Sequence, residues 1–293
     1  MAAQIIDGKL IAEHVRNEVA AEVAERSKAG KKAPGLATVL VGDNTASRSY
    51  VSSKQKACKE VGINSFGYDL PATATQKEVE DLVTRLNEDD AVNGILVQLP
   101  LPAGLDEERV LKLISVEKDV DGFHPINIGR LAQKGRDPLF VPCTPIGVIH
   151  LLKTVLPSLE GVNAVVLGRS NIVGMPVALL LIRENATVTV CHSRTPNIAD
   201  YTRQADILIA AIGKAEFVTA DMVKKGAVVI DVGINRVADR NSPKGHKLVG
   251  DVKYAEVAEK ASWITPVPGG VGPMTIAMLM HNAVKACKQQ NGL

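Results

Sequence analysis

The sequence predicts an α/β protein with parallel sheets. Short β-rich runs recur along the chain, and each is followed by a stretch with helical periodicity. This alternation occurs in the first part of the chain and again in the second part. Parallel strands need a crossover connection, so the pattern indicates right-handed strand–helix–strand units. A length of 293 residues is enough for two such domains.

In the first part, apolar runs at 35–42, 65–70 and 92–100 predict three strands. A helix that carries Lys54 follows the first strand, and Gly62 is suited to end it. Thr75 and Glu78 have the spacing of a capping box, which predicts a helix as far as about residue 87. A further helix is expected at 107–114, followed by a loop at 117–125.

The second part repeats the pattern. A helix is expected from about Pro145, and a long final helix from Pro273 to about Lys288. The polar segment 238–247 is the best candidate for an exposed loop. Four strands are predicted, at 163–168, 186–191, 206–213 and 227–233.

Composition argues against several classes of protein. The net charge is +2 without a Lys/Arg block, and 3% of residues are aromatic, so no nucleic-acid partner is expected. No apolar run approaches the length of a membrane-spanning helix. The four cysteines are scattered and the histidines show no ligand spacing, which predicts a reduced protein without a metal site. The N-terminus has no secretory pattern, so we expect a cytoplasmic protein.

The stretch VVLGRSNIVGMP (165–176) is predicted to be a strand, a turn and a helix. Gly168, Ser170 and Gly174 are small residues at positions where a dinucleotide-binding turn needs them, because backbone amides must approach a pyrophosphate. The spacing is G-x-S-x-x-x-G rather than G-x-G-x-x-G. A tight turn with no ligand therefore remains an alternative.

The end of the next strand favours NADP over NAD. NAD sites usually have an acidic residue there, which binds the ribose 2′-hydroxyl. Here the strand ends in His192, Ser193 and Arg194, and Arg169 in the glycine turn is placed to reach the same group. Arginine binds phosphate oxygens through two donors at once. A solvated surface charge is the alternative for Arg194.

Lys54 lies on the apolar face of its predicted helix, one turn after Tyr50. Gln98 ends the third strand, and Asp121 lies in the loop that follows the next helix. Ligands of open α/β sheets bind at the carboxyl ends of the strands, so we expect Lys54, Gln98 and Asp121 to meet there. Desolvation of a lysine favours proton transfer. The alternative is that Lys54 extends to water over the helix surface. Lys118 and Asp119 are interpreted as loop charges only.

Six motifs, in order over nearly the whole chain, resemble the signatures of the bifunctional methylenetetrahydrofolate dehydrogenase/cyclohydrolase family. The most specific are the Y-x-x-x-K helix and P-G-G-V-G-P-M-T. The segment 238–247 carries no family motif. The motifs are YVSSK (50–54), GILVQLPLP (94–102), KDVDG (118–122), PCTP (142–145), GRSNIVGMP (168–176) and PVPGGVGPMT (266–275).

The resemblance implies two reactions on tetrahydrofolate derivatives at one site. In the first, 5,10-methylenetetrahydrofolate passes a hydride to NADP. In the second, water opens the methenyl cation to 10-formyltetrahydrofolate. It implies that Lys54 is the general acid/base, that Gln98 orients Lys54, and that Asp121 binds the pterin. Tyr50 would stack on the aminobenzoyl ring, with Ser47 as a helper.

The family's fold is two α/β domains with a cleft between them, the second a Rossmann-type NADP-binding domain, and the family usually forms homodimers. This implies a folate-binding catalytic domain at 1–122 plus 273–293 and an NADP-binding domain at 123–272. Substrate contacts are expected from Pro268, Gly269, Gly270 and Val271, and further cofactor contacts from Ile234 and Thr275.

Three alternatives stay open on the residues. Another NADP-dependent dehydrogenase of similar architecture, acting on a shikimate-like or amino acid substrate, would share the glycine turn but have no use for Tyr50 and Gln98 together. A non-catalytic nucleotide-sensing module would tolerate loss of Lys54. A monofunctional methylenetetrahydrofolate dehydrogenase would keep the lysine without hydrolysing the product.

Overall fold

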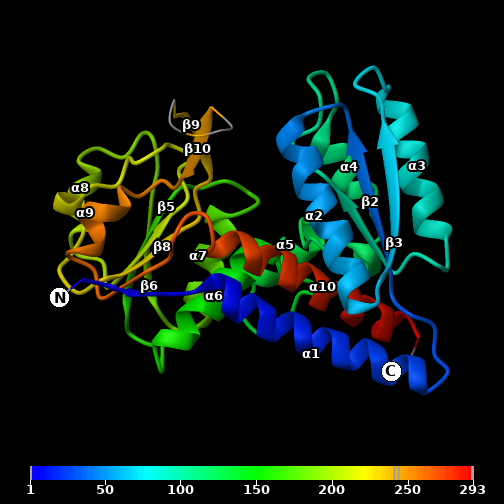
Figure 1. Ribbon diagram of the computed structural model, residues 1–293, viewed down its shortest axis with the longest axis horizontal. Helices are drawn as coiled ribbons and strands as arrows, with labels where there is room; N and C mark the ends of the chain where they lie inside the picture. The colour runs from blue at the N-terminus through cyan, green and yellow to red at the C-terminus, as the bar shows by residue number, and fades with distance from the viewer. Residues whose placement is uncertain (1, 240–241, 243–244, 292–293) are drawn as a thin grey trace. The chain divides into compact units, whose positions relative to one another are not determined.

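The computed structural model describes residues 2–239, 242 and 245–291. The chain forms two compact units, both of α/β type (Figure 1). Unit 1 comprises Met1–Ala12 and Thr144–Thr275, and unit 2 comprises Glu13–Cys143 and Ile276–Leu293. The division falls inside the two long helices, α1 (Gly8–Lys28) and α10 (Val271–Gln290).

Unit 2 contains a parallel sheet with the strand order β3-β2-β4. The central strand β2 is buried along its whole length, as its continuous apolar run predicts. The edge strand β3 is partly exposed. The strands are β2 (Gly35–Val41), β3 (Asn64–Leu70) and β4 (Gly94–Val97), and the shorter helices are α2 (Thr45–Val61), α3 (Gln76–Glu88), α4 (Glu107–Leu113), the 3₁₀ turn η1 (Val116–Lys118) and α5 (Pro125–Ala132).

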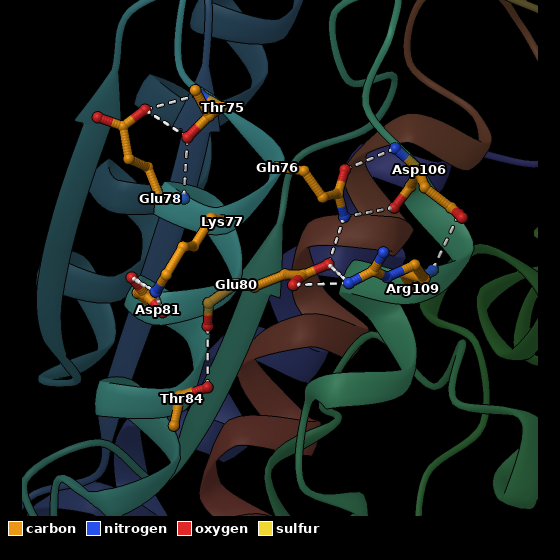
Figure 2. Close-up of polar contacts among 9 residues, drawn as sticks. All are labelled: Thr75, Gln76, Lys77, Glu78, Glu80, Asp81, Thr84, Asp106 and Arg109. Carbon is orange, nitrogen blue, oxygen red and sulfur yellow. Dashed lines mark hydrogen bonds and ion pairs between the residues drawn. The ribbon is translucent and has the colours of Figure 1, made fainter.

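The helix signals of unit 2 are confirmed. Gly62 ends α2 in the left-handed conformation, at φ 81°. Thr75 and Glu78 form the predicted capping box at the start of α3, and Figure 2 shows both halves of it. The same figure shows Glu80 of α3 paired with Arg109 of α4, which ties these two helices together beside the sheet.

Unit 1 contains a six-stranded parallel sheet with the order β1-β11-β8-β7-β5-β6. Its strands are β5 (Asn163–Leu167), β6 (Thr187–Cys191), β7 (Ile207–Ala210), β8 (Val228–Asp231), β11 (Trp263–Ile264) and β1 (Gln4–Ile5). Its shorter helices are α6 (Cys143–Val155), α7 (Gly174–Arg183), α8 (Ile198–Thr202), the 3₁₀ turn η2 (Ala220–Met222) and α9 (Tyr254–Ala258).

The two parallel sheets share one topological feature. In each, the first strand of a consecutive trio is central, with the second strand on one side and the third on the other: β3-β2-β4 in unit 2 and β6-β5-β7 in unit 1. The first connection therefore runs to one side of the central strand, and the second crosses to its other side. Such a switch point opens a crevice at the carboxyl ends of the strands, where α/β proteins bind ligands.

The structure corrects several sequence-based expectations. Helix α6 begins at Cys143 and has Pro145 in its first turn, as predicted, whereas α10 begins at Val271, two residues before the predicted start at Pro273. The first helical turn needs no intrahelical N–H donor and so tolerates proline. Strands β1 and β11 are two residues long, too short for a periodic signal. Strand β1 pairs with β11, and residues 2–12 cluster with unit 1, whereas the sequence groups them with residues 13–122.

The predicted loop at 238–247 is wrong at both ends. Strands β9 (Asn235–Ala238) and β10 (His246–Val249) form an antiparallel pair there, whereas residues 240–241 and 243–244 lie outside the described residues. The side chains of β9 and β10 are all partly or fully exposed. The sequence of these two strands therefore gives no signal of a buried strand. Over the described residues, no helix has both the length and the apolar composition for crossing a membrane.

Candidate active site

Lys54 and Gln98 meet at the switch point of unit 2. Lys54 Nζ donates to Gln98 Oε1 at 3.0 Å, and the lysine is only 7% exposed. Gln98 directly follows β4, and its own Nε2 donates to Leu99 O at 2.6 Å. The amide is therefore held at one end by the backbone and presents its oxygen to the amine. The alternative that Lys54 extends into water is excluded by its burial.

Lys54 lies on the buried face of helix α2. Val51, Ala57 and Cys58 are buried against unit 2. Tyr50, one turn before Lys54, is 39% exposed and so does not belong to the buried face. Ser47 is buried in the first turn, where its backbone N–H donates to the cap residue Asn44. The tyrosine ring consequently lies on the outer side of the helix, accessible to a ligand.

Asp121 completes this cluster together with a cysteine. Burial raises the pKa of the Asp121 carboxyl, and the charge of Lys54 and a hydrogen bond from the Cys143 thiol partly offset that rise. The Cys143 side chain is 1% exposed and also lies 3.4 Å from Val120 O. Burial and the neighbouring Asp121 raise the pKa of the Cys143 thiol well above its usual value. Cys143 is thus a neutral hydrogen-bond donor here rather than a nucleophile.

The interpretation of Lys118 and Asp119 as loop charges is wrong. Lys118 is buried and donates to Asp89 O at 2.8 Å and Leu86 O at 3.1 Å. Asp119 is 1% exposed and accepts from the backbone N–H groups of the next turn, as well as from Asn127 Nδ2 at 2.7 Å. Burial raises the pKa of Asp119 to about 7. These two residues fix the loop from which Asp121 projects.

In unit 1, the glycine turn follows β5 at that unit's switch point. Gly168 has φ +119°, and a Cβ atom there would lie 2.1 Å from Ala211 O after β7. A Cβ atom on Gly174 would lie 2.2 Å from Gly168 O. Ser170 Oγ accepts from Val173 N at 3.2 Å and Gly174 N at 3.3 Å, so it caps the start of α7. These two amides are therefore already bonded, as is the amide of Gly168, which donates to Cys191 O at 2.8 Å.

The predicted phosphate-binding residues come directly after β6. Ser193 and Arg194 are exposed, as is Arg169 in the glycine turn. His192 Nδ1 accepts from Arg194 N at 3.2 Å, while Thr195 Oγ1 accepts from His192 N at 3.0 Å. This small turn holds Arg194 at the end of the strand. The contribution of Thr195 was not predicted, although a threonine after a strand is a recognisable turn signal.

The segment at 268–271 forms a tight turn within unit 1. Gly269 has φ +114°, and a Cβ atom on Gly270 would lie 2.7 Å from Pro266 O. Pro268 is exposed, whereas Val271 is buried as the first residue of α10. Only glycine permits this backbone path, which is consistent with a loop that a flat ring could approach closely.

Ile234 and Thr275 are also in unit 1. Ile234 is 44% exposed at the carboxyl end of the sheet, three residues after β8. Thr275 is partly buried, and its Oγ1 lies 2.9 Å from Thr144 Oγ1. The Thr275 hydroxyl is therefore already engaged within the unit.

Sequence reasoning missed a pair of buried carboxylates behind the strand ends of unit 1. Asp251 Oδ2 accepts from Ile212 N and Gly213 N, both at 2.8 Å, and so fixes the turn after β7. Asp231 accepts from Asp251 N at 2.9 Å and Val252 N at 3.0 Å, and burial raises its pKa to about 7. The available signal was an acidic residue enclosed by an apolar run, as in AVVID.

Asn282 was missed as well, because an asparagine within a helical pattern gives no functional signal.

Within residues 2–239, 242 and 245–291, no group of three or more His, Cys, Asp or Glu side chains is arranged to hold a metal ion.

Comparison with known proteins agrees with this geometry. Two family descriptions match the chain: the catalytic domain of tetrahydrofolate dehydrogenase/cyclohydrolase over residues 6–121, and the NAD(P)-binding domain of the same family over residues 142–291. The bifunctional protein FolD of Chlorobium chlorochromatii is 53% identical over 293 residues and is covered over 99% of each chain.

Two solved structures are similar over their full length. The Trypanosoma brucei methylenetetrahydrofolate dehydrogenase–cyclohydrolase, complexed with NADP and an inhibitor, superposes with a TM-score of 0.96 at 42% identity, covering 100% of both chains. The Campylobacter jejuni bifunctional enzyme FolD gives a TM-score of 0.92 at 49% identity, covering 99% of this chain and 100% of that one. On these matches, the chain belongs to the tetrahydrofolate dehydrogenase/cyclohydrolase family.

Proposed function

We propose that this protein oxidises 5,10-methylenetetrahydrofolate with NADP and hydrolyses the resulting methenyl cation to 10-formyltetrahydrofolate. Unit 2 provides the folate-binding and proton-transfer groups, and unit 1 binds the cofactor. The observation that carries the proposal is the hydrogen bond of 3.0 Å between the buried Lys54 Nζ and the partly buried Gln98 Oε1, beside the Asp121 carboxyl, in a chain of this family.

The hydrolysis needs a group that moves protons, and Lys54 supplies it. Water adds to the methenyl carbon and loses a proton, which leaves a hydroxyl group on that carbon. One C–N bond then breaks: its nitrogen gains a proton, and the hydroxyl loses its proton to become the formyl C=O, so one proton is released overall. A single amine can take the first proton and return the second. Gln98 fixes the direction of the amine, because its oxygen accepts from Nζ while its Nε2 is bound to Leu99 O. The site thereby limits the amine to one productive orientation.

Asp121 and Tyr50 bind the folate in this proposal. A carboxylate accepts from the amino and ring N–H groups of a pterin, and those donors favour its ionised form against the effect of burial. Tyr50 is partly exposed and offers a flat face to the aminobenzoyl ring. Ser47 lies in the turn before Tyr50, where its burial helps to fix the start of the helix.

The residues of unit 1 fit NADP. Gly168 and Gly174 bring backbone into close approach at the switch point, where dinucleotides bind in α/β sheets. An NAD site usually has an acidic residue after the second strand, whereas this chain has hydrogen-bond donors suited to a 2′-phosphate. These donors are Ser193, Arg194 and Arg169. NADP supplies the hydride acceptor when bound. The protein's part in that step is to position the donor carbon, because hydride loss leaves a stabilised cation and needs no strong base.

We extend the proposal to a cytoplasmic homodimer that associates through unit 1. Strand β6 is an edge strand of the six-stranded sheet, and an unpaired strand edge is able to pair with a second chain. Light scattering after size-exclusion chromatography tests this part, and a monomer at micromolar concentration would contradict it.

The decisive experiment is a two-stage assay with the purified protein. Addition of 5,10-methylenetetrahydrofolate and NADP should produce NADPH, followed by decay of the methenyl absorbance. NADPH without decay of the methenyl signal beyond its spontaneous rate would indicate a monofunctional dehydrogenase. The absence of both signals would contradict the proposed function.

A further inference from the structure

We propose that Asn282 of helix α10 is a positioning residue for Asp121. The Asn282 side chain is 3% exposed, and its Nδ2 donates to Val120 O at 2.9 Å and to Val141 O at 3.2 Å. All three residues belong to unit 2. The inference rests on the proposed function, since that function assigns Asp121 to the folate.

The first bond acts directly on Asp121. Val120 O belongs to the peptide group that joins Val120 to Asp121, and a peptide group is planar and rigid. Fixing this oxygen therefore fixes the plane from which the Asp121 backbone continues. On the other side of that aspartate, Gly122 has φ +76°, and a Cβ atom there would lie 2.5 Å from Pro142 N. The two chain segments at 120–122 and 141–143 are thus in contact.

The second bond fixes the neighbouring segment. Val141 stands two residues before Cys143, whose thiol contacts both Val120 O and the Asp121 carboxyl. Asn282 Nδ2 also lies 3.6 Å from Cys143 Sγ. One amide therefore joins the peptide before Asp121 to the segment that carries the thiol partner of Asp121.

The chemistry of the amide explains why asparagine suits this position. Its Nδ2 carries two hydrogens, one for each carbonyl, and it has no charge to bury. An alanine would leave Val141 O without this donor and leave Val120 O with only a thiol, which is a weak donor. A buried carbonyl that loses its partner is costly, so both segments would move to find another one.

Gln290, on the same helix, provides a control for the loss of side-chain bonds to the backbone. Its Nε2 also donates to two backbone carbonyls, Asn93 O and Glu117 O, each at 2.8 Å. Asn93 precedes β4, whereas Gln98 follows it, so this pair of bonds lies at the opposite end of the strand from the Lys54–Gln98 contact. Gln290 is exposed, whereas Asn282 is buried. Loss of Gln290 removes two bonds to backbone carbonyls without touching the peptide next to Asp121.

The experiment compares Asn282→Ala, Asn282→Ser and Gln290→Ala in the full-length protein. Methenyl hydrolysis, NADP affinity and the thermal midpoint are measured for each. Asn282→Ala should lower kcat/KM for hydrolysis on the order of 10- to 100-fold and raise the KM for the folate, because small misplacements of a binding group have effects of that size. The affinity for NADP, which is proposed to bind unit 1, should be unchanged. Asn282→Ser keeps one donor and should fall between Asn282→Ala and the unmodified protein.

Gln290→Ala should lower the thermal midpoint but keep hydrolysis at the unmodified rate. The inference is overturned if Asn282→Ala hydrolyses at that rate, or if Gln290→Ala loses as much activity at the same loss of stability. If Asn282→Ala does not fold, Asn282→Ser and Cys143→Ala test the inference instead. In Asn282→Ser the Cys143 thiol still contacts Val120 O, and in Cys143→Ala the Asn282 amide still donates to it. Normal folate KM values in both would overturn it. If the unmodified protein shows neither reaction, the proposed function itself fails, and this inference with it.

Discussion

The two switch points of this protein have the same strand topology and different chemistry. At the switch point β3-β2-β4 of unit 2, the functional groups are side chains: a buried lysine bonded to a glutamine, next to the partly buried carboxyl of Asp121. At the switch point β6-β5-β7 of unit 1, the functional groups are mainly backbone: a glycine turn lies close to the residue that follows β7, and exposed arginines flank it. Proton transfer needs desolvated groups in fixed positions, whereas a dinucleotide needs close backbone approach and accessible cations.

The largest effect should come from the side-chain crevice. Lys54→Met removes the amine while keeping the length and apolar stem of the side chain. Methenyl hydrolysis should fall by roughly 10² to 10⁴, the usual contribution of a general acid/base. Binding of NADP, measured by fluorescence titration, should be retained. Lys56→Met, on an exposed face of the same helix, is the control. Hydrolysis at the unmodified rate by Lys54→Met would show that Lys54 is not the proton-transfer group of unit 2.

The next effect concerns the backbone crevice. Gly168→Ala would place a Cβ atom 2.1 Å from Ala211 O at a φ of +119°, so the turn must move. NADPH formation should fall by at least about tenfold, which corresponds to a loss of 1.4 kcal/mol, while hydrolysis of added methenyltetrahydrofolate continues. Gly161→Ala, which also has a positive φ but open space around it, controls for backbone strain. Loss of both reactions in Gly168→Ala would show that the two sites do not function independently.

A smaller effect is expected from the two exposed cations. Arg169→Ala combined with Arg194→Ala should raise the KM for NADP by about 10- to 100-fold and leave the KM for NAD nearly unchanged, because each charged hydrogen bond contributes about 1.5 to 3 kcal/mol before solvent screening. Arg203→Ala, an exposed arginine paired with Asp200 in the same unit, is the control. Equal losses for the two cofactors would contradict the assignment to the 2′-phosphate.

The smallest effect concerns the carboxyl that each unit buries behind its crevice, Asp119 in unit 2 and Asp231 in unit 1. Burial raises the pKa of each to about 7. Between about pH 4 and 7 the folded protein therefore holds more protons than the unfolded chain, whose aspartates titrate near 3.9. Stability should fall as the pH rises through this window. Each carboxyl should contribute to the fall independently.

Urea unfolding at pH 5 and pH 8 measures this contribution. Asp119→Asn and Asp231→Asn should each lower the stability overall, because each loses an acceptor for backbone N–H groups, but each should also reduce the difference between the two pH values. An unchanged difference in both variants would show that these carboxyls titrate alike in the folded and unfolded chain.

Much of this arrangement could be predicted from local signals. The glycine turn, the capping box of α3 and the placement of Lys54 on a buried face follow from spacing, because helix periodicity and turn chemistry are local properties. The short strands β1 and β11 and the paired strands β9 and β10 could not be predicted in the same way. Strand β1 pairs with β11, which is distant in sequence. Strands β9 and β10 pair with each other but show no pattern of buried side chains.

The sequence by itself determined the α/β alternation, the position of both crevices and the residue types that furnish them, because these depend on patterns a few residues long. Only the tertiary structure decided that Asn282, Cys143 and Val120 meet beside Asp121, because Asn282 and the carbonyl that it contacts are separated by 162 positions in the sequence. A buried amide is stable only where folding brings unpaired carbonyls to it, and no local pattern records which carbonyls those are.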